Sequence, residues 1–428
     1  MSERPRRRTL ARGSVAEAAE ACLAAIRERE PGLRAFAHLD DDAVRRAARQ
    51  LDAAPAEGLP LRGVPIGVKD LIDTADAPTE YGSPVYRGHR PSSDAAVVRA
   101  LRAAGALLVG KTVTTEFALF QAGPTRNPLD PLRTPGGSSS GSAAAVAAGL
   151  LPVALGTQTA GSITRPASFC GIVGFKPTFG TLDREGVLPV SGTLDTVGLL
   201  ARDVEHAVEV FRVLRGDPRR EPEAPPPPLQ NPRLGFVRPP EWLQAEQYTR
   251  DGIERLKQRL RYRGIDAVDV ELPESFAGLA AAQNTVMEYE AARNLGPRCE
   301  GHGELVSARL VALLRRGASI PEPDYRDALD LASGCRRELD GLFSGVDALA
   351  VPAVLGEAPP ATEGTGDPIF CRAWTLLGCP TVSLPLLTGP SGLPVGVQLV
   401  GRLHDDDRLL AVAAHLMQGA RPATLMRE

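Results

Sequence analysis

The sequence predicts an α/β fold, in which strands and helices alternate along the chain. Apolar strands at 64–68 and 106–109 flank a helix at 94–104, which ends at Gly105. This strand–helix–strand order is typical of α/β architecture. Short apolar runs predict three more buried strands later in the chain, at 348–354, 381–386 and 395–400.

The N-terminal part is predicted to begin with two helices. Ser14 and Glu17 have the spacing of a capping box, which indicates a helix start. Proline cannot continue the hydrogen-bond ladder of a helix, so we expect Pro31 and Gly32 to end this helix near Glu30. Further elements are predicted at 40–53 (helix), 142–148 (a helix of small residues) and 152–155 (strand).

Residues 217–232 form the clearest break in the chain, with the sequence DPRREPEAPPPPLQNP. Consecutive prolines favour the extended polyproline conformation, so we expect a Pro-rich surface connection here. After it, a strand is predicted at 233–238 and a helix at 248–263, and helical segments dominate to about residue 344.

The composition is that of an ordinary water-soluble protein. Of 428 residues, 43% are hydrophobic and 24% are charged, and the net charge of −3 gives no reason to expect nucleic acid or a membrane as a partner. The apolar stretch at 143–155 is shorter than the roughly 20 residues that cross a bilayer. Cysteines and histidines lack metal-ligand spacing, and no secretory segment follows the start. We therefore expect a cytoplasmic protein without metal or cofactor, and the sequence leaves a homodimer open.

Lysine is rare in this chain, since only four of the 49 basic residues are lysine and the others are arginine. Arginine stays protonated, whereas a buried lysine can lose its proton and act as a base. Lys69 follows the apolar strand at 64–68 and is therefore a candidate base. Lys257 is expected to be an ordinary exposed helix residue, and the sequence does not separate a special role from chance for Lys111 and Lys176.

Two glycine/serine clusters lie within residues 136–162, which read GGSSSGSAAAVAAGLLPVALGTQTAGS. Glycine in such quantity is costly for folding, and it suggests a need for free backbone N–H groups or for close approach of a ligand. A phosphate-binding loop is disfavoured because no lysine follows Gly141. A nucleophile elbow around Ser139 is disfavoured because a turn at 132–135 precedes it instead of a core strand.

The third interpretation is a serine hydrolase without histidine. Ser162 would be the nucleophile, and a neutral Lys69 would be the base, since burial at the end of an apolar strand lowers a lysine pKa. Ser138 would carry the proton between them. The N–H groups that would form an oxyanion hole are those of Thr159, Ala160, Gly161 and Ser162.

These segments resemble the amidase signature family of Ser–cisSer–Lys hydrolases, and in particular its malonamidase-like branch. The similarity rests on PGGSSSGSAAAVAAG, GTQTAGSITRPASFCGIVGFKPT and RGVPIGVKDLID. It extends over most of the chain through AGALLVGKTVTTEFA, NPLDP, SGTLDTVGLLAR and GLPVGVQLVG. The resemblance implies a single α/β/α domain, with a large mixed central β-sheet covered by helices. Residues 13–216 would be the core with the catalytic residues, and 233–428 would supply the rest of the sheet and the pocket helices.

The resemblance also implies roles for the site residues. Lys69, Ser138 and Ser162 would be the catalytic triad, with Ser138 on a cis peptide bond to the residue before it. Ser139 and Thr157 would form hydrogen bonds within the triad.

The chain departs from the common form of the family at the nucleophile turn. Gln158 stands where much of the family has Asp, and Ala160 stands where it has Gly, so Ala160 is expected to need a backbone without positive φ. Arg165 stands three residues after Ser162 instead of two, as in the malonamidase-like branch, where this arginine binds a substrate carboxylate. The alternative is that Arg165 is a structural ion-pair partner.

The predicted function is an amidohydrolase that cleaves the carbon–nitrogen bond of a small amide through an acyl-enzyme. Two alternatives stay open. One is the amidase (A-type) component of a tRNA-dependent amidotransferase, which would use the same triad on glutamine together with partner subunits. Gln158, the shifted Arg165 and the modest length count against it. The other is a non-catalytic protein that kept the fold, and the complete triad counts against that. Residues 240–345 and a loop near 370–377 are expected to shape the pocket.

Overall fold

Among the residues that the computed structural model describes, 14–216 and 231–418, eleven strands form one mixed sheet. Their order across the sheet is β1-β3-β2-β4-β6-β5-β10-β11-β9-β7-β8. Parallel pairs join β2 to β3 and β4, and join β7 to β8 and β9, whereas the other neighbours are antiparallel. The strands are β1 Phe36–Leu39, β2 Pro65–Lys69, β3 Leu107–Thr112, β4 Val153–Gln158, β5 Val173–Lys176, β6 Thr196–Ala201, β7 Arg233–Val237, β8 Asp266–Val270, β9 Ala348–Pro352, β10 Thr381–Thr388 and β11 Pro394–Val400.

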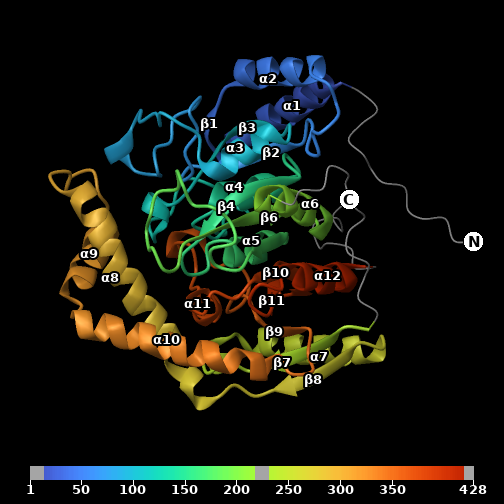
Figure 1. The fold of residues 1–428 in the computed structure, drawn as a ribbon, viewed down its shortest axis with the longest axis vertical. Helices are drawn as coiled ribbons and strands as arrows, with labels where there is room; N and C mark the ends of the chain where they lie inside the picture. Colours follow the sequence, from blue (N-terminus) through green and yellow to red (C-terminus); the bar gives the residue numbers. More distant parts are fainter. Residues whose placement is uncertain (1–13, 217–230, 419–428) are drawn as a thin grey trace, which may run out of the picture.

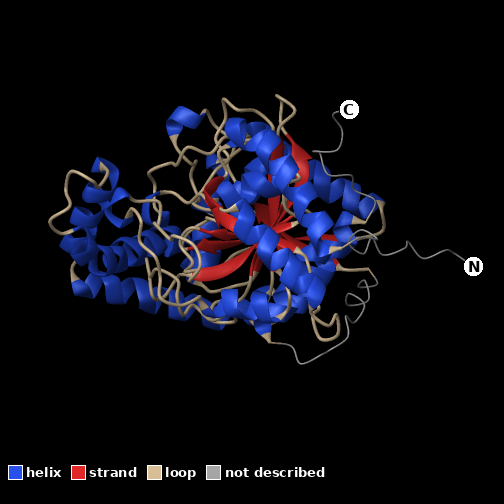
Figure 2. Cartoon of the chain, turned by 90° about the horizontal axis from the view of Figure 1, so that it is seen from above, coloured by secondary structure: helices blue, strands red, loops and turns tan. Residues whose placement is uncertain are grey.

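Helices cover both faces of this sheet, as Figures 1 and 2 show, so the predicted single domain with a large mixed sheet is confirmed. The helices α8, α9 and α10, in yellow and orange, lie together along one side of the molecule (Figure 1). The helices are α1 Val15–Leu33, α2 Asp41–Ala53, α3 Ala96–Ala103, α4 Ser140–Ala147, α5 Thr164–Cys170, α6 Val204–Arg215, α7 Gln247–Tyr262, α8 Leu279–Cys299, α9 Ala308–Ser319, α10 Glu322–Leu342, α11 Ile369–Leu376 and α12 Asp406–Met417.

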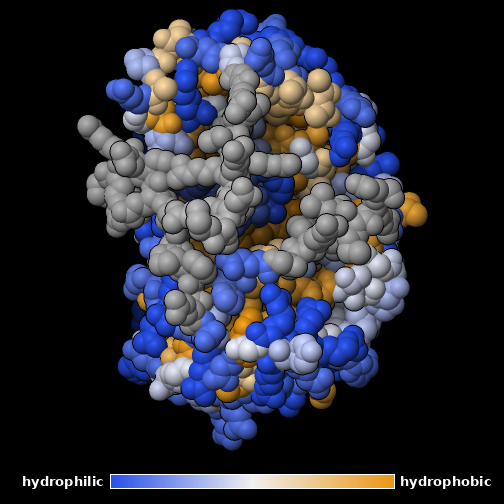
Figure 3. All heavy atoms as spheres, turned by 90° about the vertical axis from the view of Figure 1, so that its right-hand side faces the viewer, coloured by the Kyte–Doolittle hydropathy of each residue, from blue (hydrophilic) through white to orange (hydrophobic). Residues whose placement is uncertain are grey.

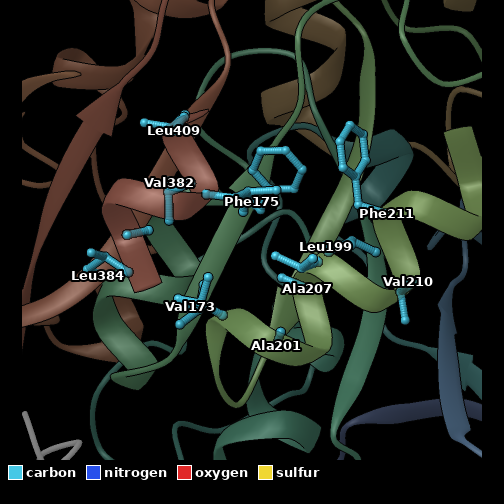
Figure 4. Packing of buried hydrophobic residues seen from close by; sticks show 14 of the residues in the cluster. Val173, Phe175, Leu199, Ala201, Ala207, Val210, Phe211, Val382, Leu384 and Leu409 are labelled. Atoms are coloured by element: carbon cyan, nitrogen blue, oxygen red, sulfur yellow. The ribbon is translucent and has the colours of Figure 1, made fainter. Parts of the chain in front are cut away.

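The hydrophobic core lies between the apolar strands and the helices that pack against both faces of the sheet. Along β4, Val153 and Leu155 belong to one apolar cluster and Ala154 belongs to another, because successive side chains of a strand point to opposite faces. Figure 4 shows one of these clusters, in which the ring of Phe175 on β5 meets that of Phe211 on α6 edge-on, with centroids 4.9 Å apart. Central strands buried on both faces explain the nearly uninterrupted apolar runs in the sequence.

The first helix begins as predicted and ends later than predicted. Both hydrogen bonds of the capping box form between Ser14 and Glu17. The helix continues through Pro31 to Leu33, so the predicted end near Glu30 is wrong. The carboxylate of Glu30 accepts the N–H groups of the two residues that follow Arg34, and these bonds secure the last turn despite the proline.

The second half of the chain also differs in part from the prediction. The helical stretch is correct for α8, α9 and α10, but it is preceded by the unpredicted strand β8. The loop expected near 370–377 is wrong, because most of it forms the helix α11. The Pro-rich connection lies outside the described residues from 217 to 230.

All four lysines are buried, which the sequence suggested only for Lys69. The prediction that Lys257 is an exposed helix residue is wrong, because its ammonium group pairs with Asp269 and Glu254 while its side chain is covered. A long lysine side chain can bury its stem and still bring its charge to partners at the surface.

Lys176 is the buried lysine with the weakest compensation for its charge. Among the described residues, its ammonium group makes one hydrogen bond, to the carbonyl of Pro177 at 2.8 Å. Burial lowers the pKa of Lys176 from 10.5 to about 8. At ~1.4 kcal/mol for each pH unit, this corresponds to about 3 kcal/mol of lost stability.

We expect Lys176→Met to raise the free energy of unfolding at pH 7 by ~2 kcal/mol, since the lost hydrogen bond offsets part of the gain. Between pH 8 and 10.5 the unfolded wild type binds more protons than the folded one, so its stability rises with pH and the advantage of the variant shrinks. Urea unfolding at pH 7 and pH 10 measures both effects. Lys257→Met, which breaks ion pairs, should show no gain, and a gain independent of pH for Lys176→Met would contradict the explanation.

Hydrophilic side chains predominate at the upper and lower ends of the face in Figure 3. Within 14–216 and 231–418, no helix combines the length and the apolar character needed to cross a membrane.

Candidate active site

The predicted site residues meet at the carboxyl ends of two parallel neighbours, β2 and β4. Lys69 is the last residue of β2, and the chain leaves β4 at Gln158 to enter the second glycine/serine cluster. The pairing of Val68 with Leu155 brings Lys69 beside Thr157. The carboxyl ends of parallel strands are where α/β proteins commonly form their sites.

The first glycine/serine cluster leads into α4, which packs against the same strands. At Gly141, a Cβ atom would lie only 2.1 Å from the carbonyl oxygen of Ala35 and 2.3 Å from the nitrogen of Val113. This glycine therefore serves close approach of backbone to backbone rather than to a ligand. The tight contact fixes the start of α4 and with it the serines before it.

Lys69 and Ser138 are in direct contact. The Nζ atom of Lys69 lies 2.7 Å from the Oγ atom of Ser138 and 2.7 Å from the Oγ1 atom of Thr157. The peptide bond between Gly137 and Ser138 is cis, as the resemblance implies. Among the described residues, the Ser139 hydroxyl makes no hydrogen bond to the side chains of Lys69, Ser138 or Ser162, and it contacts the backbone of Thr157 at 3.3 Å.

The environment of Lys69 favours the neutral amine. The side chain is 0% exposed, and burial lowers its pKa well below the usual 10.5. The carboxylate of Asp195 opposes this shift, whereas the guanidinium of Arg165 adds to it. A neutral amine 2.7 Å from a hydroxyl can accept its proton.

Ser162 lies in the loop between β4 and α5, next to the Ser138 segment. Its carbonyl oxygen accepts a hydrogen bond from the N–H of Ser139 at 3.4 Å, which holds the two clusters against each other. The Ser162 hydroxyl makes no hydrogen bond to any residue in the described part of the chain.

The loop at 159–162 presents free backbone donors. None of the N–H groups of Thr159, Ala160, Gly161 and Ser162 donates to another residue within 14–216 or 231–418. The next two N–H groups, of Ile163 and Thr164, are different, because both donate to the side-chain oxygen of Gln158 at 2.9 and 3.0 Å. The predicted oxyanion-hole donors are thus the unpaired ones.

The two departures from the common family sequence fit this loop. Gln158 closes the turn by accepting two N–H groups through its Oε1 atom, while its Nε2 atom donates to Thr375 on α11. Ala160 does not have a positive φ, so the expectation for its backbone is confirmed.

Arg165 is a buried cation whose hydrogen bonds within the described residues all go to neutral oxygen atoms. It is 3% exposed, and its guanidinium donates to the carbonyl oxygens of Gly137 at 2.7 Å and Gly366 at 2.8 Å and to the hydroxyl of Thr365. Among the described residues, its Nε atom has no hydrogen-bond partner and no carboxylate forms an ion pair with it, although the charge of Asp367 is near enough to raise its pKa. Whether Arg165 binds a substrate carboxylate or has a structural role stays a prediction. Burial lowers the pKa of Arg165 to about 10.

Asp195 belongs to the site, although the sequence analysis gave it no role. It accepts the hydroxyl of Thr159 at 2.5 Å and the N–H groups of Val190 and Ser191 at 2.8 Å. Burial raises the pKa of Asp195 to about 6, and these hydrogen bonds oppose the shift. Its position in SGTLDTVGLLAR, just before β6, was the available signal. The described residues contain no cluster of three His, Cys, Asp or Glu side chains suited to a metal ion.

Comparison with known proteins agrees with this geometry. The model of the Amidase family matches residues 17–410. The A subunit of the glutamyl-tRNA(Gln) amidotransferase from Anaeromyxobacter dehalogenans strain 2CP-C is 38% identical, over 96% of this chain and 94% of that protein. A solved amidase structure has 34% identity and a TM-score of 0.87, covering 96% of this chain and 97% of its own. The peptide amidase of Stenotrophomonas maltophilia has 30% identity and a TM-score of 0.81, covering 96% and 95%.

Proposed function

Because this chain belongs to the amidase family, we propose that it cleaves the carbon–nitrogen bond of a small amide through an acyl-enzyme on Ser162. The observation that carries the proposal is the 2.7 Å contact between the buried amine of Lys69 and the hydroxyl of Ser138, beside a loop of unpaired N–H groups. A buried lysine in its neutral form is a base, and unpaired donors stabilise a developing oxyanion.

The proposed reaction moves one proton along the triad and back. Ser162 gives its proton to Ser138 while Ser138 gives its own to Lys69, and the Ser162 Oγ atom bonds to the amide carbon. The N–H groups of Ala160 and Gly161 stabilise the oxygen that becomes negative. The proton returns to the leaving nitrogen as the C–N bond breaks. A water molecule, activated by the same relay, then cleaves the ester to release the acid.

A second candidate function is supported by the relative from Anaeromyxobacter dehalogenans, which belongs to a glutamyl-tRNA(Gln) amidotransferase. Its name implies further subunits and a tRNA, in contrast to our expectation of no nucleic-acid partner. The argument from modest length no longer counts against it, because the similarity covers 94% of that protein. Gln158 and the position of Arg165 still favour a free-standing amidase. This candidate predicts cleavage of the glutamine side-chain amide.

Ammonia release from a panel of amides tests the proposal. The panel holds glutamine, amides with a carboxylate two or three carbons away, and neutral aliphatic and aromatic amides. Turnover by the purified chain alone, lost in Ser162→Ala, is the expected result. Activity on glutamine that requires added partner subunits and tRNA would favour the amidotransferase instead. If an acylating probe fails to label Ser162, the protein is a non-catalytic member of the family.

Arg165 predicts a preference for substrates with a carboxylate, as in the malonamidase-like branch. A buried guanidinium with an unpaired Nε atom and no ion pair among the described residues gains a charge-assisted hydrogen bond when a carboxylate enters. We expect Arg165→Met to lower the ratio of kcat/KM for acidic over neutral amides by about 10- to 100-fold. An equal loss for both classes would mean that Arg165 only braces Gly137 and Gly366.

A further inference from the structure

We propose that Gln283, on α8, is a positioning residue that aims the N–H groups of the oxyanion loop at the substrate. The inference rests on the proposed function, because it assigns a role in the reaction at Ser162. Gln283 lies 124 residues from Thr159 along the chain, in a stretch where the sequence carries no motif, yet its Nε2 atom donates to the carbonyl oxygen of Thr159 at 2.9 Å. Gln283 is 0% exposed.

The geometry of the peptide unit turns this contact into an orientation. In a planar trans peptide, the C=O of one residue and the N–H of the next point in opposite directions. Holding the carbonyl of Thr159 toward α8 therefore turns the N–H of Ala160 away from α8. That N–H is one of the unpaired donors of the loop.

The next two peptide units are held in the same way from other elements. The hydroxyl of Thr375 on α11 donates to the carbonyl of Ala160 at 2.7 Å, which aims the N–H of Gly161. The N–H of Arg165 donates to the carbonyl of Gly161 at 2.9 Å, which aims the N–H of Ser162. Three consecutive carbonyls are thus each bound, and the N–H groups of the same three peptide units have no partner among the described residues. Donors fixed before the reaction need no reorganisation in the transition state.

The two side chains that hold the loop carbonyls, Gln283 and Thr375, each accept a hydrogen bond from another donor, and this fixes their orientation. The guanidinium of Arg372 donates to the Oε1 atom of Gln283 at 2.6 Å, and arginine can only donate, so the Nε2 atom must face Thr159. Likewise, the Nε2 atom of Gln158 donates to the hydroxyl of Thr375 at 3.0 Å, so the hydrogen of that hydroxyl is free for Ala160. Two chains of hydrogen bonds therefore end on the loop. One leads through Gln283 to the carbonyl of Thr159, and the other leads through Thr375 to the carbonyl of Ala160.

The chain offers a matched control beside Gln283. Arg372 also donates to the Oδ1 atom of Asn284 at 3.1 Å, and Asn284 makes no hydrogen bond to the 159–162 loop. Both Asn284 and Arg372 line a pocket between α8 and the start of α11. Asn284→Leu removes an amide of α8 that touches the same arginine, while Gln283→Met removes the donor to the loop and keeps the volume.

The test compares these two variants by steady-state kinetics and by the rate at which a fluorophosphonate labels Ser162, since that adduct places an oxygen in the oxyanion hole. We expect Gln283→Met to lower kcat about 10- to 100-fold with KM within about twofold, to lower the labelling rate similarly, and to leave the pH profile unchanged. Asn284→Leu should stay within about twofold of the wild type.

Several results would overturn the role of Gln283. These are a kcat within about threefold of the wild type, a loss seen only in KM, or an equal loss in Asn284→Leu. Should Gln283→Met fail to fold, Thr375→Val and Thr375→Ser decide, because valine removes the equivalent donor and serine restores it. Wild-type protein that is labelled at Ser162 but turns over no amide would count against the proposed function, while the relative labelling rates still decide this inference.

Discussion

Ser162→Ala is expected to reduce amide turnover by at least about 10⁴-fold, the largest effect of any single substitution in this chain. The substitution removes the atom that would form the acyl-enzyme, and no other hydroxyl of the site can replace it. Lys69 and Ser138 contact each other, and Ser139 contacts backbone atoms of Thr157. Since the rest of the site is intact, the variant should still bind the amide with a similar Kd.

Ammonia release and covalent labelling measure the loss, and Ser140→Ala serves as the control. Ser140 belongs to the same cluster, but its hydroxyl donates to the carbonyl of Val113 at 3.3 Å instead of facing the triad. We expect Ser140→Ala to keep activity within a few-fold of the wild type. Turnover by Ser162→Ala at more than about a hundredth of the wild-type rate would assign the nucleophile elsewhere.

The local chemistry of the site could be predicted from the sequence because its parts are encoded by short segments. The rarity of lysine singled out Lys69, and the hydroxyl residues of two glycine-rich clusters supplied Ser138 and Ser162. All three were expected in one site, and the structure brings Lys69 and Ser138 into contact and holds the Ser162 loop against the Ser138 segment.

The supports of the site could not be predicted, because they come from distant elements. Gln283 and Thr375 reach the oxyanion loop from helices more than a hundred residues away in the sequence. A lone Gln in a helix or Thr in an apolar segment carries no signal for such a role. Asp195 was closer to recognition, since it stands in a segment that resembles the family, but its contact with Thr159 depends on the pairing of β4 with β6.

For the fold, too, features with a clear local pattern could be predicted, and features without one could not. Long apolar runs such as those of β2, β10 and β11 were predicted close to their observed bounds. The four-residue strands β1 and β5 were missed because so short a segment has too few alternations to reveal its period. Lys257 was misassigned for a related reason, since helical spacing did not reveal the carboxylate of Asp269 on the neighbouring strand β8.

Lys69→Met is expected to lower kcat by about 10³-fold or more, with partial recovery at high pH as hydroxide replaces the missing base. In the proposed mechanism, wild-type activity requires the neutral amine. Burial lowers the pKa of Lys69 well below 10.5, so kcat/KM should rise with pH through that lowered pKa and then level off. The variant should lack this titration and show only the hydroxide-dependent recovery at high pH, and a pH series of initial rates distinguishes the two.

The pH at which activity rises should depend on the charges near Lys69. The carboxylate of Asp195 raises the pKa of Lys69, so Asp195→Asn should shift the rise to lower pH. The guanidinium of Arg165 lowers the same pKa, so Arg165→Met should shift the rise to higher pH. Opposite shifts are the result expected when the titrating group lies near both charges, as Lys69 does. No shift from either substitution would assign the titration to a group distant from both.

The free energy of unfolding shows whether Lys69→Met is inactive because it lacks the base or because it is unfolded. Because the pKa of Lys69 is lower in the folded chain than in the unfolded chain, the unfolded wild type holds more protons between those two values. Wild-type stability should therefore rise with pH across that window, and Lys69→Met should lack this contribution. Relative to the wild type, the free energy of unfolding of the variant is then higher near neutral pH than at high pH, because burial of Lys69 costs the wild type more at the lower pH. An inactive variant with undiminished urea resistance at pH 7 identifies Lys69 as a residue held for its chemistry at the expense of stability.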